Sequence, residues 1–231
     1  MNKKVLLLDY SVDELETPLI RRWIPEGYEV DVFAPLRQAG FPQPGAHDRV
    51  IHTGSSLTIT GEAPFQGPAE DFIRRSIDSG VPQMGICYGH QLLVRAILRK
   101  GAVRRNPAGV EIGWGEVHFS PDAASRIGVP RLCRIFQYHF DEVVSLPDSA
   151  LVAAWNGHTR IQAFIDDRLR LFGIQFHPEF DEETGNRHFL KDSAAIAAQG
   201  ASAEKIVREK PKPPADGRFF RFFLSNSWES R

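Results

Sequence analysis

The chain has 231 residues, 42% of them hydrophobic and 25% charged, and its 28 basic and 29 acidic side chains nearly cancel. This composition excludes a disordered or fibrous protein, and the balanced charge provides no field that would attract nucleic acid or an anionic membrane. Only two cysteines occur and the apolar run at the start is too short for a signal sequence or a membrane span, so we expect a cytoplasmic protein in a reducing compartment.

The first hundred residues alternate between short apolar runs and segments with helical periodicity. Apolar residues recur at three- and four-residue intervals from Leu15, from Ala69 and from Leu92, which predicts three helices. The runs that we predict as strands along the whole chain are Val5–Leu8, Val30–Phe33, Val50–Ile51, Val81–Ile86, Val117–Phe119, Arg134–Tyr138, Leu151–Trp155, Gln162–Ile165 and Leu169–Phe176. Strands that alternate with helices predict a parallel sheet covered by helices on both faces.

From Gly113 to Phe176 the helical periodicity fades, and predicted strands follow one another at the spacing of hairpins. We therefore expect residues 115–170 to add an antiparallel edge to the same sheet. The predicted fold is α/β, with three layers and a doubly wound, mostly parallel central sheet that carries this antiparallel extension.

The C-terminal region differs in composition from the rest. We expect one domain over residues 1–199, followed by a polar, proline-rich connector over 200–217. Residues 218–231 are predicted to form a C-terminal helix that packs on the same domain. Their aromatic cluster, Phe219–Leu224, has a second interpretation as a contact with another protomer or with a membrane surface.

The most informative segment joins a buried strand directly to an apolar-periodic helix at Cys87. Glycines stand two positions before and two positions after this cysteine, at Gly85 and Gly89, where they remove the Cβ atoms that would clash in a tight turn. Such a turn presents the thiol at the carboxyl edge of the sheet and near a helix N-terminus, which favours the thiolate. We predict that Cys87 is a nucleophile and that Cys133, within a predicted strand, is a core residue.

A nucleophilic thiol needs a base, and the base needs a group that orients it. His177 and Glu179 follow the last predicted strand and are separated by Pro178. Residues two apart point the same way in an extended backbone, so the imidazole and the carboxylate are presented together. The imidazole can accept the thiol proton, while the carboxylate fixes its tautomer.

These motifs resemble those of the triad-type class I glutamine amidotransferases. Residues 85–91 match the family's elbow pattern, residues 177–179 match its His-Pro-Glu signature, and residues 111–115 resemble its Glu-x-Gly-Trp segment. The resemblance extends over about the first 180 residues and is greatest to the glutaminase portion of GMP synthase and to related stand-alone proteins, a group that includes γ-glutamyl peptidases.

The resemblance implies a role for each residue of the site. Cys87 would be the nucleophile, His177 the general base and acid, and Glu179 the orienting carboxylate. The family's oxyanion hole would use the backbone N–H groups of Tyr88 and Gly54, although Thr53 and Ser55 depart from the usual Gly-Gly-Pro of that turn.

Several residues are candidates for contacts with the substrate. Gln91 is expected either to face the substrate or to form a hydrogen bond from its helix to a loop. Ser55, with its neighbour Ser56, and the loop containing His139 and Asp141 are further candidates for contacts to the glutamyl moiety. The histidines lack the spacing of a metal site, so we expect no metal and no cofactor.

Three functions fit these features. The first is a glutaminase that releases ammonia from glutamine through a cysteine thioester and passes it to a separate synthetase subunit. The second is an autonomous γ-glutamyl peptidase, hydrolase or transferase that acts on another γ-glutamyl amide. The third, a non-catalytic binding module of the same fold, predicts a broken triad, whereas the three residues are present.

Overall fold

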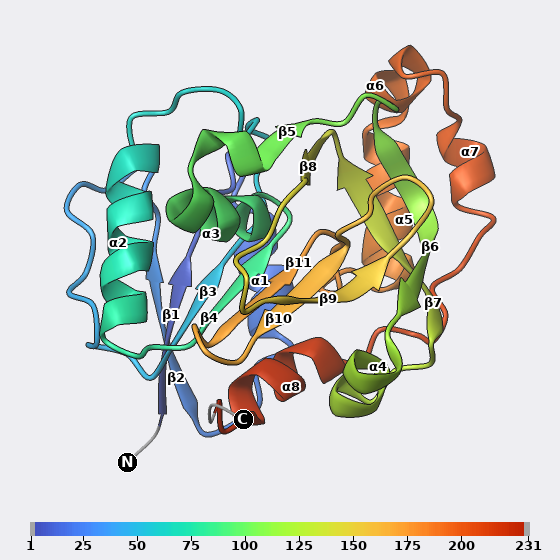
Figure 1. The fold of residues 1–231 in the computed structure, drawn as a ribbon. Coiled ribbons are helices and arrows are strands. Elements are labelled where there is room, and N and C mark those ends of the chain that lie inside the picture. The colour runs from blue at the N-terminus through green and yellow to red at the C-terminus, as the bar shows by residue number, and fades with distance from the viewer. Residues whose placement is uncertain (1–2, 229–231) are drawn as a thin grey trace.

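A nine-stranded sheet runs through the centre of the computed structural model, which describes residues 3–228 (Figure 1). Five neighbouring strands pair in parallel, in the order β2 (Tyr28–Phe33), β1 (Lys3–Leu8), β3 (Arg49–His52), β4 (Gln83–Ile86) and β11 (Leu171–Ile174). Four antiparallel strands continue the sheet, namely β10 (Ala163–Asp166), β9 (Leu151–Trp155), β6 (Glu111–Phe119) and β7 (Leu132–His139). The predicted fold, including its antiparallel extension, is confirmed.

A second, two-stranded sheet pairs β5 (Val103–Arg105) with β8 (Asp141–Val143), and the sequence patterns did not predict it. The three helices that the periodicity predicts are α1 (Glu16–Arg21), α2 (Gln66–Asp78) and α3 (Tyr88–Leu98). Further helices, which were not predicted as separate elements, are α4 (Pro121–Ile127), α5 (Glu182–Lys191), α6 (Ser193–Ala198) and α7 (Ala203–Ile206). The last described helix is α8 (Arg218–Ser225).

Two hydrophobic cores lie on opposite faces of the sheet. Val5 and Leu7 of β1 pack in the core that includes α1, α4 and α8, whereas Leu6 and Leu8 pack in the core that includes α2 and α3. All four side chains are at most 2% exposed. A strand buried on both faces needs an uninterrupted apolar run, which is why this segment shows no alternation of polar and apolar residues.

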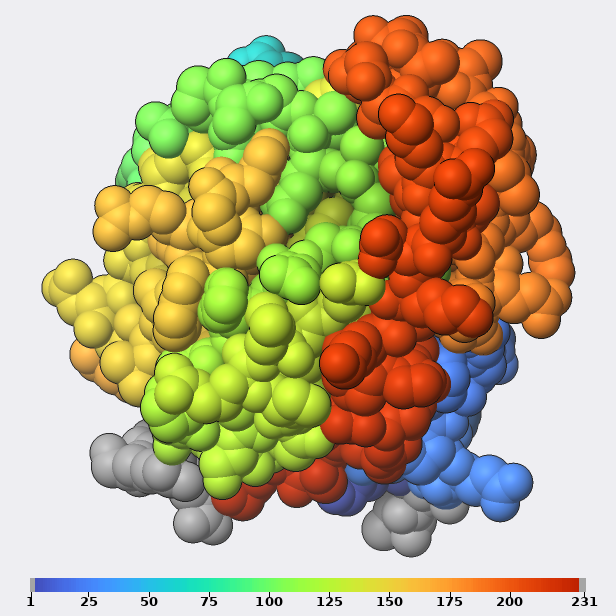
Figure 2. Space-filling model, turned by 90° about the vertical axis from the view of Figure 1, so that its right-hand side faces the viewer, coloured from blue at the N-terminus to red at the C-terminus, as the bar shows by residue number. Residues whose placement is uncertain are grey.

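The C-terminal segment closes one side of the molecule. Between α7 and α8 the chain lies beside the edge strand β7, where Arg134 and Lys212 exchange backbone hydrogen bonds of 2.7 and 2.9 Å (Figure 2). The five apolar side chains of α8 are all buried, which leaves them unavailable to a membrane surface. The predicted C-terminal helix over 218–231 includes residues 229–231, which lie outside the described part of the chain. Within residues 3–228, none of the helices has the length and apolar character needed to cross a membrane.

Candidate active site

Cys87 lies in a strained turn between β4 and α3. Its backbone adopts φ 49° and ψ −104°, a conformation that L-residues rarely occupy and that costs about 1–3 kcal/mol. A Cβ at Gly85 would lie 2.5 Å from the backbone of Gly89, and a Cβ at Gly89 would lie 2.4 Å from the carbonyl oxygen of His52. Both glycines are therefore required by close packing of the backbone, as the spacing predicts.

The pairing of β4 with β11 brings Cys87 and His177 to one edge of the sheet. Ile86 and Ile174 are partners in this parallel ladder, and the N–H of Cys87 donates to the carbonyl oxygen of Ile174 at 2.8 Å. Cys87 follows directly after β4, and His177 follows three residues after the end of β11. Parallel pairing thus places two residues 90 positions apart in the sequence at the same end of adjacent strands.

His177 is held between a carboxylate and the thiol. Its Nδ1 lies 2.6 Å from Oε1 of Glu179, which leaves Nε2 free of that contact, and Cys87 lines the same cavity as this ring. Burial disfavours the imidazolium, but the negative charges of Glu179 and Cys87 and their hydrogen bonds outweigh it and raise the pKa of His177 well above 6.5. The arrangement therefore favours the imidazolium form of His177.

Glu179 is fully buried, and its backbone is anchored by two side chains from the N-terminal region. Its carbonyl oxygen accepts hydrogen bonds from Nη2 of Arg22 at 2.7 Å and from Nε1 of Trp23 at 2.9 Å. The backbone N–H of His177 donates to the carbonyl oxygen of Phe136 in β7 at 3.0 Å. These contacts fix the position of the His-Pro-Glu segment from both sides.

The turn after β3 brings Gly54 against the ring of His177. A Cβ at Gly54 would lie 2.8 Å from Cε1 of His177, so glycine permits this approach. The carbonyl oxygen of Thr53 accepts from the N–H of Gly89 at 3.1 Å, and in a trans peptide the N–H of Gly54 then points the opposite way. Within the described chain, neither Gly54 nor Tyr88 uses its N–H in a backbone hydrogen bond.

The residues that we predict to contact the substrate lie near each other, and hydrogen bonds join several of them. Gln91 donates from Nε2 to the carbonyl oxygen of Asp141 at 2.9 Å, so it forms the helix-to-loop hydrogen bond, and it also lines the cavity. His139 is paired with Glu111 at 3.0 Å and lies 3.2 Å from the same carbonyl oxygen of Asp141. The carboxylate of Asp141 accepts from the N–H of Ile59 at 3.0 Å. Ser55 and Ser56 line the cavity as well.

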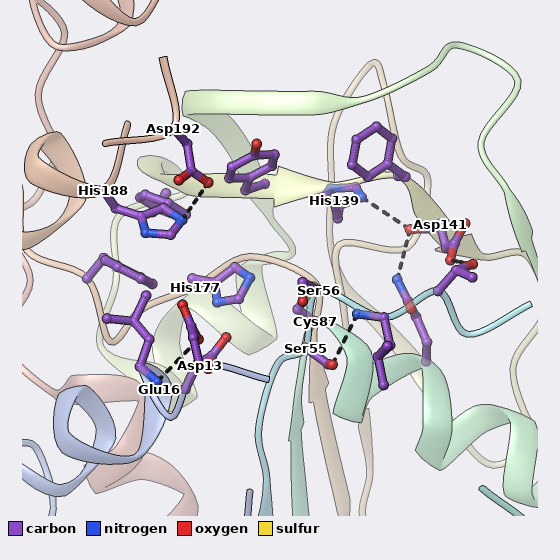
Figure 3. Close-up of a pocket in the computed structure, with 18 of the residues that line it drawn as sticks. Asp13, Glu16, Ser55, Ser56, Cys87, His139, Asp141, His177, His188 and Asp192 are labelled. Atoms are coloured by element: carbon purple, nitrogen blue, oxygen red, sulfur yellow. Dashed lines mark hydrogen bonds and ion pairs between the residues drawn. The ribbon is translucent and has the colours of Figure 1, made fainter. Parts of the chain in front are cut away.

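A cavity of about 250 Å³ contains these residues and also several that the sequence patterns did not indicate (Figure 3). The unpredicted charged or titratable members are Asp13, Glu16, Arg105, His188 and Asp192, and the aromatic ones are Phe136, Tyr138, Phe140 and Phe180. In Figure 3, His139 and Asp141 lie on one side of Cys87, whereas His188 and Asp192 lie on the other side, beyond His177.

Cys133 is a residue of β7 whose side chain packs in the hydrophobic core, and it does not line this cavity. It is 2% exposed, and its thiol donates to the carbonyl oxygen of Pro130 at 3.3 Å. Burial raises the pKa of Cys133 to about 11, which keeps the thiol protonated at neutral pH. Across residues 3–228, no cluster of three or more His, Cys, Asp or Glu side chains is arranged to hold a metal ion.

Comparison with known proteins gives a consistent set of relatives. The family model of glutamine amidotransferase class-I matches residues 60–197. A glutamine-hydrolysing GMP synthase subunit of Saccharolobus solfataricus is 33% identical over 134 residues, which span 57% of this chain and 67% of that protein. The glutamine-hydrolysing GMP synthase of Stenotrophomonas maltophilia is 32% identical over 189 residues, which span 77% of this chain and 33% of that protein.

Solved structures agree in fold. A glutamine amidotransferase from Thermotoga maritima superposes with a TM-score of 0.80 at 21% identity and covers 100% of both chains. A glutamine amidotransferase from Methylobacillus flagellatus superposes with a TM-score of 0.74 at 23% identity, covering 99% of this chain and 91% of that one. The three-layer architecture with its antiparallel extension is shared with these proteins.

Proposed function

Because the chain belongs to the class-I glutamine amidotransferase family, we propose that it hydrolyses the side-chain amide of glutamine through a γ-glutamyl thioester on Cys87. The observation that carries this proposal is the pairing of a strained cysteine elbow with the hydrogen-bonded His177 and Glu179. The products would be glutamate and ammonia.

The first half of the reaction forms the thioester. His177 takes the thiol proton, and the sulfur of Cys87 attacks the amide carbon of the substrate. The N–H groups of Gly54 and Tyr88 would stabilise the resulting oxyanion, a contribution worth about 3–4 kcal/mol per donor in well-studied cases. The carbon–nitrogen bond then breaks as the imidazolium of His177 gives its proton to the departing nitrogen.

The second half regenerates the enzyme. A water molecule loses a proton to His177 and attacks the thioester carbon, and the thiolate of Cys87 leaves. The raised pKa of His177 suits both halves, because its imidazolium must persist until the leaving nitrogen is protonated. Glu179 supports that charge and keeps Nε2 directed at the sulfur.

Recognition of the glutamyl moiety is assigned to the end of the cavity that contains Gln91 and Asp141. Arg105 lies there, with its guanidinium over the ring of Phe140 at 4.1 Å, and would pair with the α-carboxylate. Ser55, together with Ser56 and His139, would provide further polar contacts. This end would specify the glutamyl half tightly, since a buried site rejects a substrate that leaves its polar groups unpaired.

The fate of the ammonia defines the biological role. The S. solfataricus relative is named as one subunit of a glutamine-hydrolysing synthase, which supports transfer of ammonia from this chain to a separate synthetase. A second candidate is an autonomous γ-glutamyl hydrolase. It is favoured by the extension of the cavity beyond His177, past the ring of Phe180 and towards His188, which gives more room than ammonia needs.

Product analysis tests the proposal. The isolated protein is incubated with glutamine, asparagine and a γ-glutamyl dipeptide, and glutamate, aspartate and free amine are quantified. We expect glutamate from glutamine or from the dipeptide and very little aspartate, because the shorter side chain of asparagine cannot fill both the oxyanion hole and the α-carboxylate site. Equal turnover of asparagine and glutamine would contradict the γ-glutamyl assignment, and a clear preference for the dipeptide would favour the second candidate.

A further inference from the structure

The two ends of the cavity differ in the charged side chains that line them. Arg105, the only arginine or lysine among the described residues that line the cavity, lies at the Asp141 end, 3.5 Å from that carboxylate. The end beyond His177 instead contains the carboxylates of Asp13, Glu16 and Asp192 (Figure 3). We call these three residues the acidic end.

The acidic end is not neutralised by its histidine. Nε2 of His188 lies 3.6 Å from Oδ2 of Asp192. Burial lowers the pKa of His188 despite the opposing charge of Asp192, so the ring is neutral at pH 7. His188 therefore provides no positive charge at this end of the cavity.

Glu16 has a buried carboxyl group with one oxygen that accepts no hydrogen bond from the described residues. It lies at the start of α1, is 9% exposed, and its Oε2 has no hydrogen bond with any described residue. Its Oε1 would lie 3.3 Å from a Cβ at Gly54, the same position that lies 2.8 Å from the ring of His177, so the carboxylate is beside the catalytic base. Burial raises the pKa of Glu16 to about 7. A bound cation would stabilise the ionised form of this buried carboxyl group.

The proton transfer from His177 indicates which part of the substrate occupies the acidic end. The departing nitrogen must take its proton from His177, so the leaving group lies on the His177 side of the thioester while the glutamyl half occupies the Asp141 end. The walls beyond His177 include Leu15 and two stacked rings, Phe136 and Phe180, with centroids 4.2 Å apart. Apolar walls that end in carboxylates suit a methylene chain with a terminal ammonium.

We propose that the acidic end binds the leaving group of a γ-glutamyl amide, and that this leaving group is an amine with a second, positively charged nitrogen, as in a γ-glutamyl diamine. The inference rests on the proposed function and assigns its substrate class. Cys87 attacks the γ-carbonyl carbon, the bond to the diamine nitrogen breaks, and His177 protonates that nitrogen. Water then releases glutamate, while the terminal ammonium stays paired with Glu16 and Asp192 until the diamine departs.

The test compares three γ-glutamyl amides of equal length whose leaving amines end in an ammonium, a methyl group or a carboxylate. We expect kcat/KM for the ammonium form to exceed that for the methyl form by at least about tenfold, because charge-assisted hydrogen bonds to the carboxylates of the acidic end are lost in the latter. The carboxylate form should be the poorest substrate. A ratio near or below one for ammonium over methyl would overturn the inference.

Two variants assign the effect to the acidic end. Glu16→Gln and Asp192→Asn should each lower the ammonium-to-methyl ratio of kcat/KM severalfold. Asp192→Asn carries the test if Glu16→Gln does not fold, since the Asp192 side chain is 32% exposed. Glu26→Gln, at an exposed position remote from the cavity lining, is the control and should keep the wild-type ratio. An unchanged ratio in Asp192→Asn would contradict the inference.

The outcomes separate this inference from the proposed function. If glutamine is hydrolysed and the ratio is near one, the thioester chemistry stands and the diamine assignment is wrong. If neither glutamine nor any of the three amides is cleaved, the proposed function fails, and the inference fails with it.

Discussion

Cys87 and Cys133 are both buried thiols attached to the same sheet, but their surroundings give them different chemistry. Cys133 lies within β7, donates to a backbone carbonyl and has a pKa raised by burial to about 11. Cys87 lies one residue beyond the end of β4, has a positive φ, and lines the same cavity as His177. The difference shows that burial alone does not decide reactivity. We expect the thiol at the strand end, in the cavity with His177, to be the reactive one.

Replacing the nucleophile should have the largest effect. Cys87→Ala is expected to lower the rate of glutamate release from glutamine by at least about 10⁴-fold, because no other described group can form the thioester at this position. Cys133→Ala is the matched control and should change the rate less than about twofold. Steady-state assays of both variants make the comparison. Equal losses in the two variants would remove the distinction between the cysteines.

His177→Ala should cost nearly as much as Cys87→Ala, about 10³–10⁴-fold, because nucleophile and base act as one unit. The double variant Cys87→Ala/His177→Ala should therefore be no slower than Cys87→Ala alone. Rates of the single and double variants measure this non-additivity. Retention of most activity in His177→Ala would place the base elsewhere, with His139 the next histidine along the cavity.

The ionisation of Glu16, which lines the same cavity as Cys87, should make the folding stability depend on pH. Its folded pKa of about 7 is raised above the ordinary 4.5, so the unfolded chain ionises first, and stability falls as the pH rises from about 4.5 through about 7. The shift corresponds to roughly 3 kcal/mol. Wild type should lose this amount relative to Glu16→Gln between pH 4.5 and pH 8.

Urea unfolding at several pH values measures the effect. Glu26→Gln, at an exposed site, should follow the wild-type pH dependence. If the stability of wild type and of Glu16→Gln fell in parallel over this range, the pKa of Glu16 in the folded protein would not be raised. The acidic end would then contain no carboxyl group with a pKa raised by burial.

Glu179→Gln should have a smaller effect on rate, about tenfold, because the amide oxygen of glutamine can still accept from Nδ1 of His177. The pKa of His177 is raised partly by the Glu179 carboxylate, so the neutral variant should have a lower His177 pKa. The alkaline limb of kcat/KM, where the imidazolium is lost, should accordingly move to lower pH. An alkaline limb that stays in place would mean that Glu179 does not support the imidazolium.

Much of the fold followed from local patterns that reflect physical constraints. Val5–Leu8 could be predicted as a doubly buried strand because every side chain in it is apolar, and Cys87 stood out because Gly85 and Gly89 flank it symmetrically. The strand-end location of His177 was also predictable, since parallel strands present their carboxyl ends at one edge.

Other features depend on tertiary contacts that leave no local pattern. Glu16 starts a six-residue helix, and nothing in its immediate sequence indicates that its carboxylate lies beside His177. The small sheet of β5 and β8 is built from three-residue strands, too short for periodicity to be measured. Helix α5 does carry a local signal for its first turn, the capping box in which Asp181 and Thr184 exchange hydrogen bonds.

The central claim, that Cys87 and not Cys133 forms a covalent bond to a γ-glutamyl substrate, is tested most directly by active-site labelling. The protein is treated with a diazo-ketone analogue of glutamine, and the intact mass and the modified peptide are determined for wild type, Cys87→Ala and Cys133→Ala. The account predicts one adduct per chain, located on Cys87, in wild type and in Cys133→Ala, and none in Cys87→Ala. An adduct on Cys133, or labelling that persists in Cys87→Ala, would contradict it.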